Sequence, residues 1–305
     1  MQKQTIGVFR NKYPYAFSPS SLGLQKRAIK KIPGSDIIIK KLPLPEKFKP
    51  NMEIPDYPPV IIFPPTHHLL WHVGIDGESQ LSSYRLFIPP EFPLYIISYD
   101  PLLPPDHTSE GIAKDFKDFI EEVIQRPVIL MALSYGGSVG IPFAGMFPEL
   151  VIKLILVVCT YTVRGSGIEL GNELLQLAKD GKPYTLEKRI GGLYRSKILS
   201  RLSNFKLWKD WPELEEVMNP LSTFINGYTH LLETPLTRKE YLPKITAPTL
   251  IIGGTHDQFS SVQDYQETRN LIPNAKLELF EGHTHTVPVE KIFGVRELIE
   301  SFLKE

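Results

Sequence analysis

Residues 127–133 form the apolar segment that most constrains the fold. They read PVILMAL, which is the length and the continuous apolar character of a strand buried on both faces of a sheet. The segment ends at Ser134, and a helical run follows to Phe147. A strand that turns sharply into a helix at a serine needs small residues around it, and Ala132 and Gly136 are small. Ser134 is therefore a candidate nucleophile, although an ordinary strand–helix turn gives the same pattern.

Further strands and helices alternate on both sides of this segment. Apolar residues within 112–124 and within 292–303 recur at helical spacing, and Thr108 or Ser109 can cap the first of these helices. We predict strands over residues 60–63, 94–99, 152–158, 248–252 and 275–280. The alternation predicts an α/β protein with a mostly parallel central sheet flanked by helices.

The alternation stops in two regions. Residues 1–27 show no clear periodicity and are expected to form an N-terminal arm, followed by a hairpin over 28–40 and an extended, proline-rich connection over 42–65. Residues 161–240 contain helical pieces at 173–179, 186–202 and 221–232 and no convincing strand. The expected division is a core of residues 28–160 and 241–305 with a helical cap over residues 161–240.

Composition excludes several classes of protein. The formal net charge is zero, so no nucleic-acid partner is expected, and we interpret the 11 Lys/Arg against 4 Asp/Glu of residues 1–60 as a solvated basic face. The single cysteine, Cys159, rules out an intramolecular disulfide framework and fits a reducing compartment. No run approaches the roughly 18 apolar residues that a membrane helix needs. We expect a soluble, cytoplasmic protein without an integral membrane segment, and make no prediction of its oligomeric state.

Candidate catalytic residues follow three of the strands, in the chain order Ser, Asp, His. Ser134 follows residues 127–133, Asp257 follows residues 248–252 through a Gly-Gly-Thr-His turn, and His283 and His285 follow residues 275–280. Loops beyond the carboxyl ends of parallel strands share one crevice, so these side chains can meet. A neutral imidazole there could take the serine proton while Asp257 holds the other ring nitrogen.

These motifs resemble the α/β-hydrolase fold family. The resemblance rests on residues 132–136 (ALSYG), on residues 247–257 (APTLIIGGTHD) and on a C-terminal histidine followed by Glu290 and an amphipathic helix. Ala132 stands where the family usually has glycine. Residues 161–240 occupy the place of the family's variable cap. The resemblance implies a serine hydrolase, carboxylesterase-like, that cleaves a carboxylic ester or related acyl substrate through an acyl-enzyme.

Two histidines compete for the role of catalytic base. The family histidine usually follows a glycine, which favours His283 after Gly282. It also typically stands five residues beyond the last strand and five before a glutamate, which gives His285 when counted from Phe280 to Glu290. We predict His285 as the base, with His283 as the alternative, and expect the other histidine to line the pocket.

The resemblance also implies two N–H donors for an oxyanion. One is the amide of Tyr135, directly after the nucleophile. The other normally comes from the loop after residues 60–63, where Pro64 and Pro65 have no N–H, so Thr66 is the first possible donor. For His67, His68 and His72 we expect structural or pocket-lining roles rather than a metal site, because no glutamate accompanies them in a zinc-binding pattern. No cofactor is expected.

Other functions are compatible with the same residues. The same triad could carry out carbon–carbon bond hydrolysis, perhydrolysis or acyl transfer. A non-catalytic binding protein with this fold is the alternative from another class, suggested by the altered Pro64-Pro65-Thr66 loop and by Thr284 where glycine is usual. The apolar residues of 161–240 suggest a substrate with an apolar part, and packing of the cap itself explains the same composition.

Overall fold

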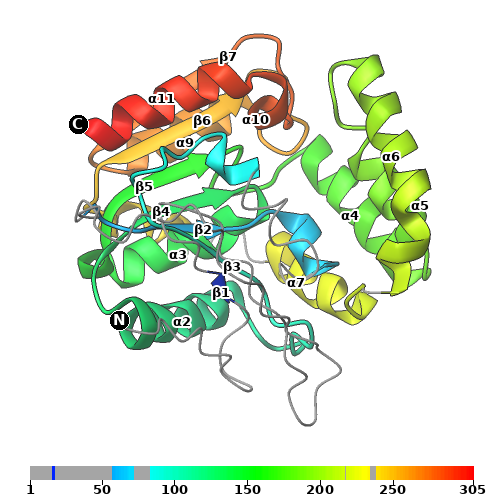
Figure 1. Cartoon of the computed structure of the whole chain (residues 1–305), viewed down its shortest axis with the longest axis horizontal. Helices are drawn as coiled ribbons and strands as arrows, with labels where there is room; N and C mark the ends of the chain where they lie inside the picture. The colour runs from blue at the N-terminus through cyan, green and yellow to red at the C-terminus, as the bar shows by residue number, and fades with distance from the viewer. Residues whose placement is uncertain (1–15, 18–56, 72–82, 217, 234–237) are drawn as a thin grey trace, which may run out of the picture.

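The computed structural model describes residues 16–17, 57–71, 83–216, 218–233 and 238–305 (Figure 1). Its centre is a seven-stranded sheet in the order β1-β3-β2-β4-β5-β6-β7. Neighbouring strands from β3 to β7 pair in parallel, and the two-residue β1 pairs antiparallel with β3. The strands are β1 (Ala16–Phe17), β2 (Val60–Phe63), β3 (Leu94–Ile97), β4 (Val128–Leu133), β5 (Val151–Val157), β6 (Thr249–Gly254) and β7 (Ala275–Phe280). The predicted α/β class with a mostly parallel sheet is confirmed.

Helices cover both faces of the sheet and extend beyond one end of it (Figure 1). They are η1 (Thr66–Leu69), α2 (Ser109–Phe119), η2 (Ile120–Ile124), α3 (Tyr135–Met146), η3 (Pro148–Leu150), α4 (Ser166–Lys179), α5 (Pro183–Ile190), α6 (Lys197–Glu216), α7 (Leu221–Glu233), η4 (Leu242–Lys244), α9 (Val262–Leu271), α10 (Val287–Glu290) and α11 (Ile292–Lys304). The predicted cap at Thr108 is present, since its side chain accepts a hydrogen bond from the Gly111 amide.

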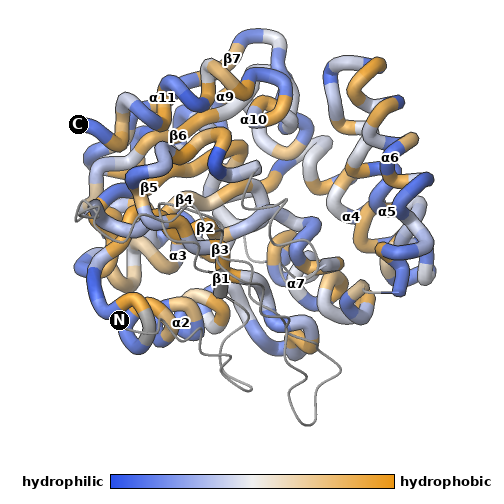
Figure 2. The backbone as a smooth tube through the Cα atoms, in the orientation of Figure 1, coloured by the Kyte–Doolittle hydropathy of each residue, from blue (hydrophilic) through white to orange (hydrophobic). Residues whose placement is uncertain are grey.

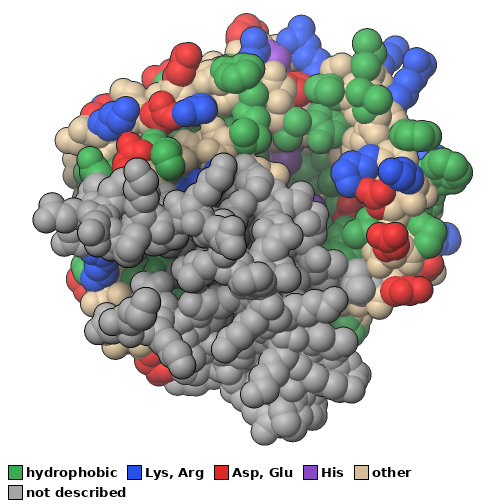
Figure 3. All heavy atoms as spheres, in the orientation of Figure 1, with side chains coloured by type: hydrophobic (Ala, Val, Ile, Leu, Met, Phe, Trp, Pro, Cys, Tyr) green, Lys and Arg blue, Asp and Glu red, His purple; other side chains and the backbone are tan. Residues whose placement is uncertain are grey.

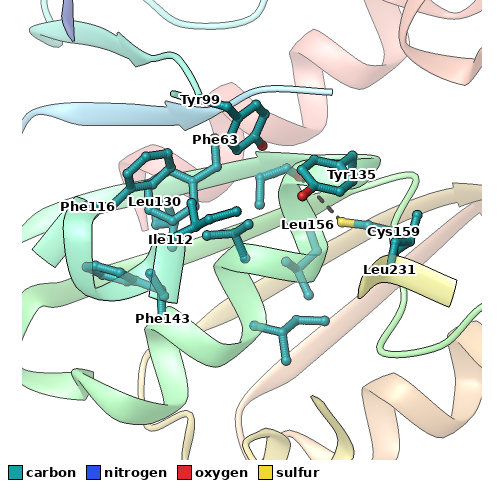
Figure 4. Close-up of a cluster of buried hydrophobic side chains, with 14 of the residues drawn as sticks. Phe63, Tyr99, Ile112, Phe116, Leu130, Tyr135, Phe143, Leu156, Cys159 and Leu231 are labelled. Atoms are coloured by element: carbon teal, nitrogen blue, oxygen red, sulfur yellow. Dashed lines mark hydrogen bonds between the residues drawn. The ribbon is translucent and has the colours of Figure 1, made fainter. Parts of the chain in front are cut away.

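Alternate residues of the central strands face two separate hydrophobic cores. Leu130 and Ala132 of β4 pack on one side of the sheet with residues of α2 and α3, such as Phe116 (Figure 4). Ile129 and Met131 pack on the other side with residues of α11. Both faces are covered, which is why β2 and β4 are apolar at every position and appear as continuous hydrophobic segments in Figure 2.

Residues 166–233 form four helices, α4 to α7, beside the sheet (Figure 1). α4 packs closely on α7. A Cβ atom at Gly171 of α4 would lie 2.7 Å from Leu232 Cδ2 of α7, so the glycine permits this close contact. The prediction of one helix over residues 186–202 was wrong. The helix is interrupted at Gly191-Gly192, between α5 and α6. The Ser196 hydroxyl then accepts a hydrogen bond from the Leu199 amide at the start of α6.

Other sequence predictions differ in detail or lie outside the described residues. The predicted helix 112–124 is α-helical only to Phe119 and ends as the π-helical turn η2. α9 was not predicted, although Ser261 and Asp264 form a capping box at its start. The hairpin expected over residues 28–40, the connection over 42–56 and the arm over 1–27, apart from β1, lie outside the described residues.

Candidate active site

Ser134 lies in a strained turn between β4 and α3. Its φ is 49° and its ψ is −116°, a combination that costs energy in a residue with a side chain. Hydrogen bonds hold the turn in place: the Ser134 amide donates to the Val157 carbonyl of β5 at 3.0 Å, and its own carbonyl accepts from Gly137 at 2.8 Å. The strain is therefore supported from the neighbouring strand and from the first turn of the helix.

Small residues around the turn allow two close approaches. A Cβ atom at Gly136 would lie 2.1 Å from the Phe63 carbonyl oxygen, so only glycine fits between α3 and β2. A Cβ atom at Gly140 would lie 2.7 Å from the Ala132 methyl group. Ala132 stands where the family usually has glycine. Gly140, one turn after Gly136 in α3, makes room for its methyl group.

A chain of hydrogen bonds connects Ser134, His285 and Asp257. The Ser134 Oγ lies 2.8 Å from His285 Nε2, and His285 Nδ1 lies 2.9 Å from both carboxylate oxygens of Asp257. A proton on Nδ1 satisfies both contacts, because Nδ1 then donates to Asp257 and the serine hydroxyl donates to Nε2. The structure therefore brings together the three residues that follow β4, β6 and β7.

The Asp257 side chain is fully buried and accepts hydrogen bonds from three further donors. Its Oδ1 accepts from the amides of Phe259 at 2.8 Å and Ser260 at 3.3 Å, and its Oδ2 accepts from the Tyr265 hydroxyl at 2.7 Å. Burial, followed by the nearby Asp257 carboxylate, raises the pKa of Tyr265 well above its ordinary value. Tyr265 therefore remains a protonated donor to Oδ2, the oxygen that His285 Nδ1 also contacts.

The role of Tyr265 was not predicted from the sequence. It stands one residue after the capping box that starts α9, so recognising the Ser261-x-x-Asp264 pattern would have placed a helix there. Its ring lies against the backbone of β6, where a Cβ atom at Gly253 would come within 2.4 Å of the Tyr265 Cζ. Gly253 therefore makes room for the residue that supports Asp257.

Gln258 links the His285 loop to the helical segment. Its Oε1 accepts from the His285 amide at 3.0 Å, and its Nε2 donates to the Leu193 carbonyl, between α5 and α6, at 2.9 Å. The Phe259 ring lies edge-on to the His285 ring with centroids 4.7 Å apart. Gln258 was not predicted from the sequence, since no local pattern indicates a contact with a loop 65 residues away.

His283 makes a different set of contacts. Its Nδ1 lies 3.0 Å from Glu290 Oε2, and both side chains are almost fully buried. The other carboxylate oxygen of Glu290 accepts from the Ser196 amide at 3.2 Å. His283 is not among the described residues that line the cavity beside Ser134, so the expectation that the second histidine lines the pocket does not hold there.

The cavity beside Ser134 is small, about 30 Å³. Thr66, Tyr135 and His285 line it together with Tyr228 and Leu231 of α7. Several hydroxyl groups form part of its wall, and those of Thr160 and Ser260 are 3.0 Å apart. The cavity has room for roughly one or two water-sized groups.

Thr66 lies at the start of η1, directly after Pro65. The N–H of a first helical residue has no partner within its own helix, so it is available to a ligand. The Thr66 side chain forms a hydrogen bond with Tyr228, which ties this loop to α7. The amide of Tyr135 is the first N–H of α3, on the opposite element of the same cavity.

The described residues contain neither a metal-binding cluster nor a membrane-spanning helix. His67 and His68 both lie in η1 with stacked rings, while His72 lies outside the described residues. Among the described residues, no group of three His, Cys, Asp or Glu side chains is arranged to hold a metal ion. No helix in the described part of the chain is both long and apolar enough to cross a bilayer.

Comparisons with solved structures agree with this fold. The esterase from Thermogutta terrifontis superposes with a TM-score of 0.60 at 19% identity, covering 81% of this chain and 89% of the esterase. MGS-M2, an alpha/beta hydrolase enzyme from a deep-sea metagenome library, superposes with a TM-score of 0.65 at 15% identity, covering 83% of this chain and 92% of MGS-M2. At these identities the likeness concerns the fold.

The chain is also similar in sequence to curated proteins and to a family model. Monoacylglycerol lipase ABHD6 of Homo sapiens is 25% identical over 211 residues, which is 65% of this chain and 61% of the lipase. An uncharacterized protein of Mycobacterium tuberculosis is 27% identical over 200 residues, which is 59% of this chain and 57% of that protein. The chain thus spans about three fifths of the length of these curated relatives. Residues 60–291 match the model of the alpha/beta hydrolase family, and the chain therefore belongs to that family.

Proposed function

We propose that the protein is a serine hydrolase that cleaves a carboxylic ester or a related acyl substrate. The observation that carries the proposal is the continuous hydrogen-bond chain from Ser134 through His285 to Asp257. The strained turn at Ser134 adds support, because strain that the surrounding structure maintains is characteristic of functional positions.

Ser134, His285 and Asp257, which form this hydrogen-bond chain, each have a defined role in the reaction. Ser134 Oγ attacks the substrate carbonyl while His285 Nε2 takes its proton, and Asp257 stabilises the imidazolium that forms. The negative charge on the carbonyl oxygen is stabilised by the amides of Tyr135 and Thr66. His285 then gives the proton to the leaving alcohol, and it later activates the water that hydrolyses the acyl-enzyme.

We further propose that residues 161–240 act as a cap over a core of residues 28–160 and 241–305. Tyr228 and Leu231 supply one wall of the cavity beside Ser134, and Leu193 holds Gln258 next to His285. The cavity is small and partly lined by hydroxyl groups. A short acyl group fits this site better than a long apolar chain.

Labelling with a fluorophosphonate probe tests the proposal. We expect the probe to modify Ser134 in the full chain and to leave the Ser134→Ala variant unlabelled. A series of p-nitrophenyl esters should then give higher kcat/KM for acetate and butyrate than for octanoate. A wild-type protein that stays unlabelled while a control esterase reacts would instead support a non-catalytic binding protein with this fold.

A further inference from the structure

Helix α6 presents large apolar side chains to solvent. None of its residues is buried, and Ile198, Leu202, Phe205 and Trp208 are 69%, 59%, 61% and 63% exposed. At 100° per residue their spacing places these four side chains on the same side of the helix, and the Phe205 and Trp208 rings lie 5.7 Å apart. An exposed line of four large apolar residues marks an interaction surface rather than ordinary surface composition.

The other exposed residues in the same stretch are all basic. Between residues 197 and 209 they are Lys197, Arg201, Lys206 and Lys209. Exposed acidic residues of α6 begin at Glu213, and the partly exposed Asp210 forms an ion pair with Lys206 at 2.5 Å. We call these four apolar and four basic side chains the α6 face. Figure 3 shows hydrophobic and basic side chains side by side along the outer edge of the molecule, where Figure 1 places α6.

This combination of side chains fits a particular chemistry. Apolar side chains on one helical surface can enter the boundary between lipid head groups and acyl chains, while long basic side chains keep their charges at the head groups. An anionic lipid surface attracts each such Lys or Arg. We propose that the α6 face docks the protein on an anionic lipid surface, with α6 lying along the surface rather than crossing it.

Charge argues against two other occupants of the α6 face. A second copy related by a two-fold axis at the centre of the α6 face would bring the Lys and Arg side chains of the two copies together, which like-charge repulsion disfavours. Residues 1–60 carry 11 Lys/Arg against 4 Asp/Glu, so this segment is also net basic. A surface rich in anionic lipid complements the charge of the α6 face, whereas a second copy of this face and residues 1–60 do not.

The α6 face is connected to the loops that carry the candidate active site. α6 begins directly after Ser196, whose amide donates to Glu290, and Leu193 accepts from the Gln258 side chain that also holds His285. These contacts couple the segment that carries the α6 face to the loop of His285. The docking itself does not depend on the proposed hydrolase activity, and it can be measured without turnover.

Co-sedimentation of the full chain with vesicles tests the proposal. We expect binding to phosphatidylcholine vesicles that contain phosphatidylglycerol, weaker binding when salt is added, and little binding to phosphatidylcholine alone. The triple variant Leu202→Ser, Phe205→Ser, Trp208→Ser should bind at least about tenfold more weakly. The double variant Arg201→Gln, Lys209→Gln should bind roughly 25-fold more weakly at low salt.

The matched control is Leu102→Ser, in the loop between β3 and α2. Leu102 is 71% exposed, as much as the residues of the α6 face, and its replacement should leave vesicle binding unchanged. If the triple variant loses its circular dichroism signal, the double variant decides, because it removes charge and no apolar contact. Wild-type protein that ignores phosphatidylglycerol vesicles, or variants that bind them as well as wild type, would overturn the proposal. A concentration-dependent dimer that the triple variant abolishes would assign the face to a second copy instead.

Discussion

Asp257, after β6, and Glu187, in α5, each have a carboxyl oxygen removed from solvent, and the surroundings of the two carboxyls differ. Asp257 accepts hydrogen bonds from His285, from the Tyr265 hydroxyl and from two backbone amides. The Oε1 atom of Glu187 is buried without a hydrogen-bond partner among the described residues. Burial raises the pKa of Glu187 to about 8, so it is held mainly in its neutral form at neutral pH.

The difference follows from how each region is held. Parallel strands fix the backbone at the sheet edge, so the loops that follow β6 and β7 can surround one carboxylate with several donors. The helices α4 to α7 are positioned by side-chain packing and side-chain hydrogen bonds, and they carry both the buried Glu187 Oε1 without a partner among the described residues and the exposed α6 face. We therefore expect the chemistry to be specified at the sheet edge and the adaptable contacts to lie in the helical segment.

The largest effects should come from the sheet edge. Ser134→Ala and His285→Ala should each lower kcat/KM for a p-nitrophenyl ester by roughly 10⁴-fold, because each breaks the hydrogen-bond chain to Asp257. His283→Ala is the matched control, since this histidine contacts Glu290 rather than Ser134, and it should lower kcat/KM by less than about tenfold. The opposite ranking of the two histidines would assign the base to His283.

The Glu187 carboxyl should make the helical segment sensitive to pH. Its pKa is raised from 4.5 to about 8, so its stabilising neutral form is fully present below the unfolded value and is lost as pH rises through about 8. Glu187→Gln does not titrate. It should therefore be more stable than wild type at about pH 9, by roughly 2–4 kcal/mol, with the difference shrinking toward about pH 5.

Chemical denaturation at the two pH values measures this difference. Glu169→Gln, an exposed glutamate of α4, is the matched control and should follow the wild-type profile. Parallel pH profiles for Glu187→Gln and wild type would mean that the Glu187 carboxyl is as well satisfied as Asp257, and the contrast between the two regions would disappear.

Tyr265→Phe measures how far donors at the sheet edge support Asp257. The change removes one hydrogen bond to Oδ2 and keeps the ring that packs on Gly253. We expect kcat to fall about tenfold with KM nearly unchanged, because a less firmly held carboxylate orients His285 less well. The pH profile of kcat/KM should shift as well, and this distinguishes a positioning role from a loss of stability. Tyr161→Phe provides a control on another buried tyrosine, and an equal loss there would count against a specific role for Tyr265.

Local sequence was sufficient for the elements that carry the candidate site. The apolar run of β4 and the small residues after it predicted a buried strand and a sharp turn at Ser134, because both depend on neighbouring residues. The break between α5 and α6 was missed, although Gly191-Gly192 and the Ser196 cap were visible. Tyr265 and Gln258 were missed because their roles depend on contacts across the fold.

The two histidines show what spacing alone cannot specify. The count to Glu290 pointed to His285, yet in the structure Glu290 contacts His283. The loop is fixed by backbone contacts: the His256 amide donates to the His283 carbonyl, and a side chain at Gly254 would collide with that carbonyl. With His283 held in this way, His285 is the histidine that reaches Ser134. Counting residues thus selected the histidine that contacts Ser134, but it did not predict which histidine Glu290 contacts.

The smallest effect should come from Cys159, a thiol that lines the cavity beside Ser134. Burial, followed by the nearby Asp257 carboxylate, raises its pKa well above the ordinary value, and its Sγ donates to the Ala132 carbonyl at 3.5 Å. The thiolate is the reactive form, so iodoacetamide at about pH 8 should leave the native protein unmodified and fully active. Intact-mass spectrometry should show modification only after unfolding in urea. Rapid alkylation of the native protein would show that groups at the sheet edge are less firmly held than the contacts of Asp257 indicate.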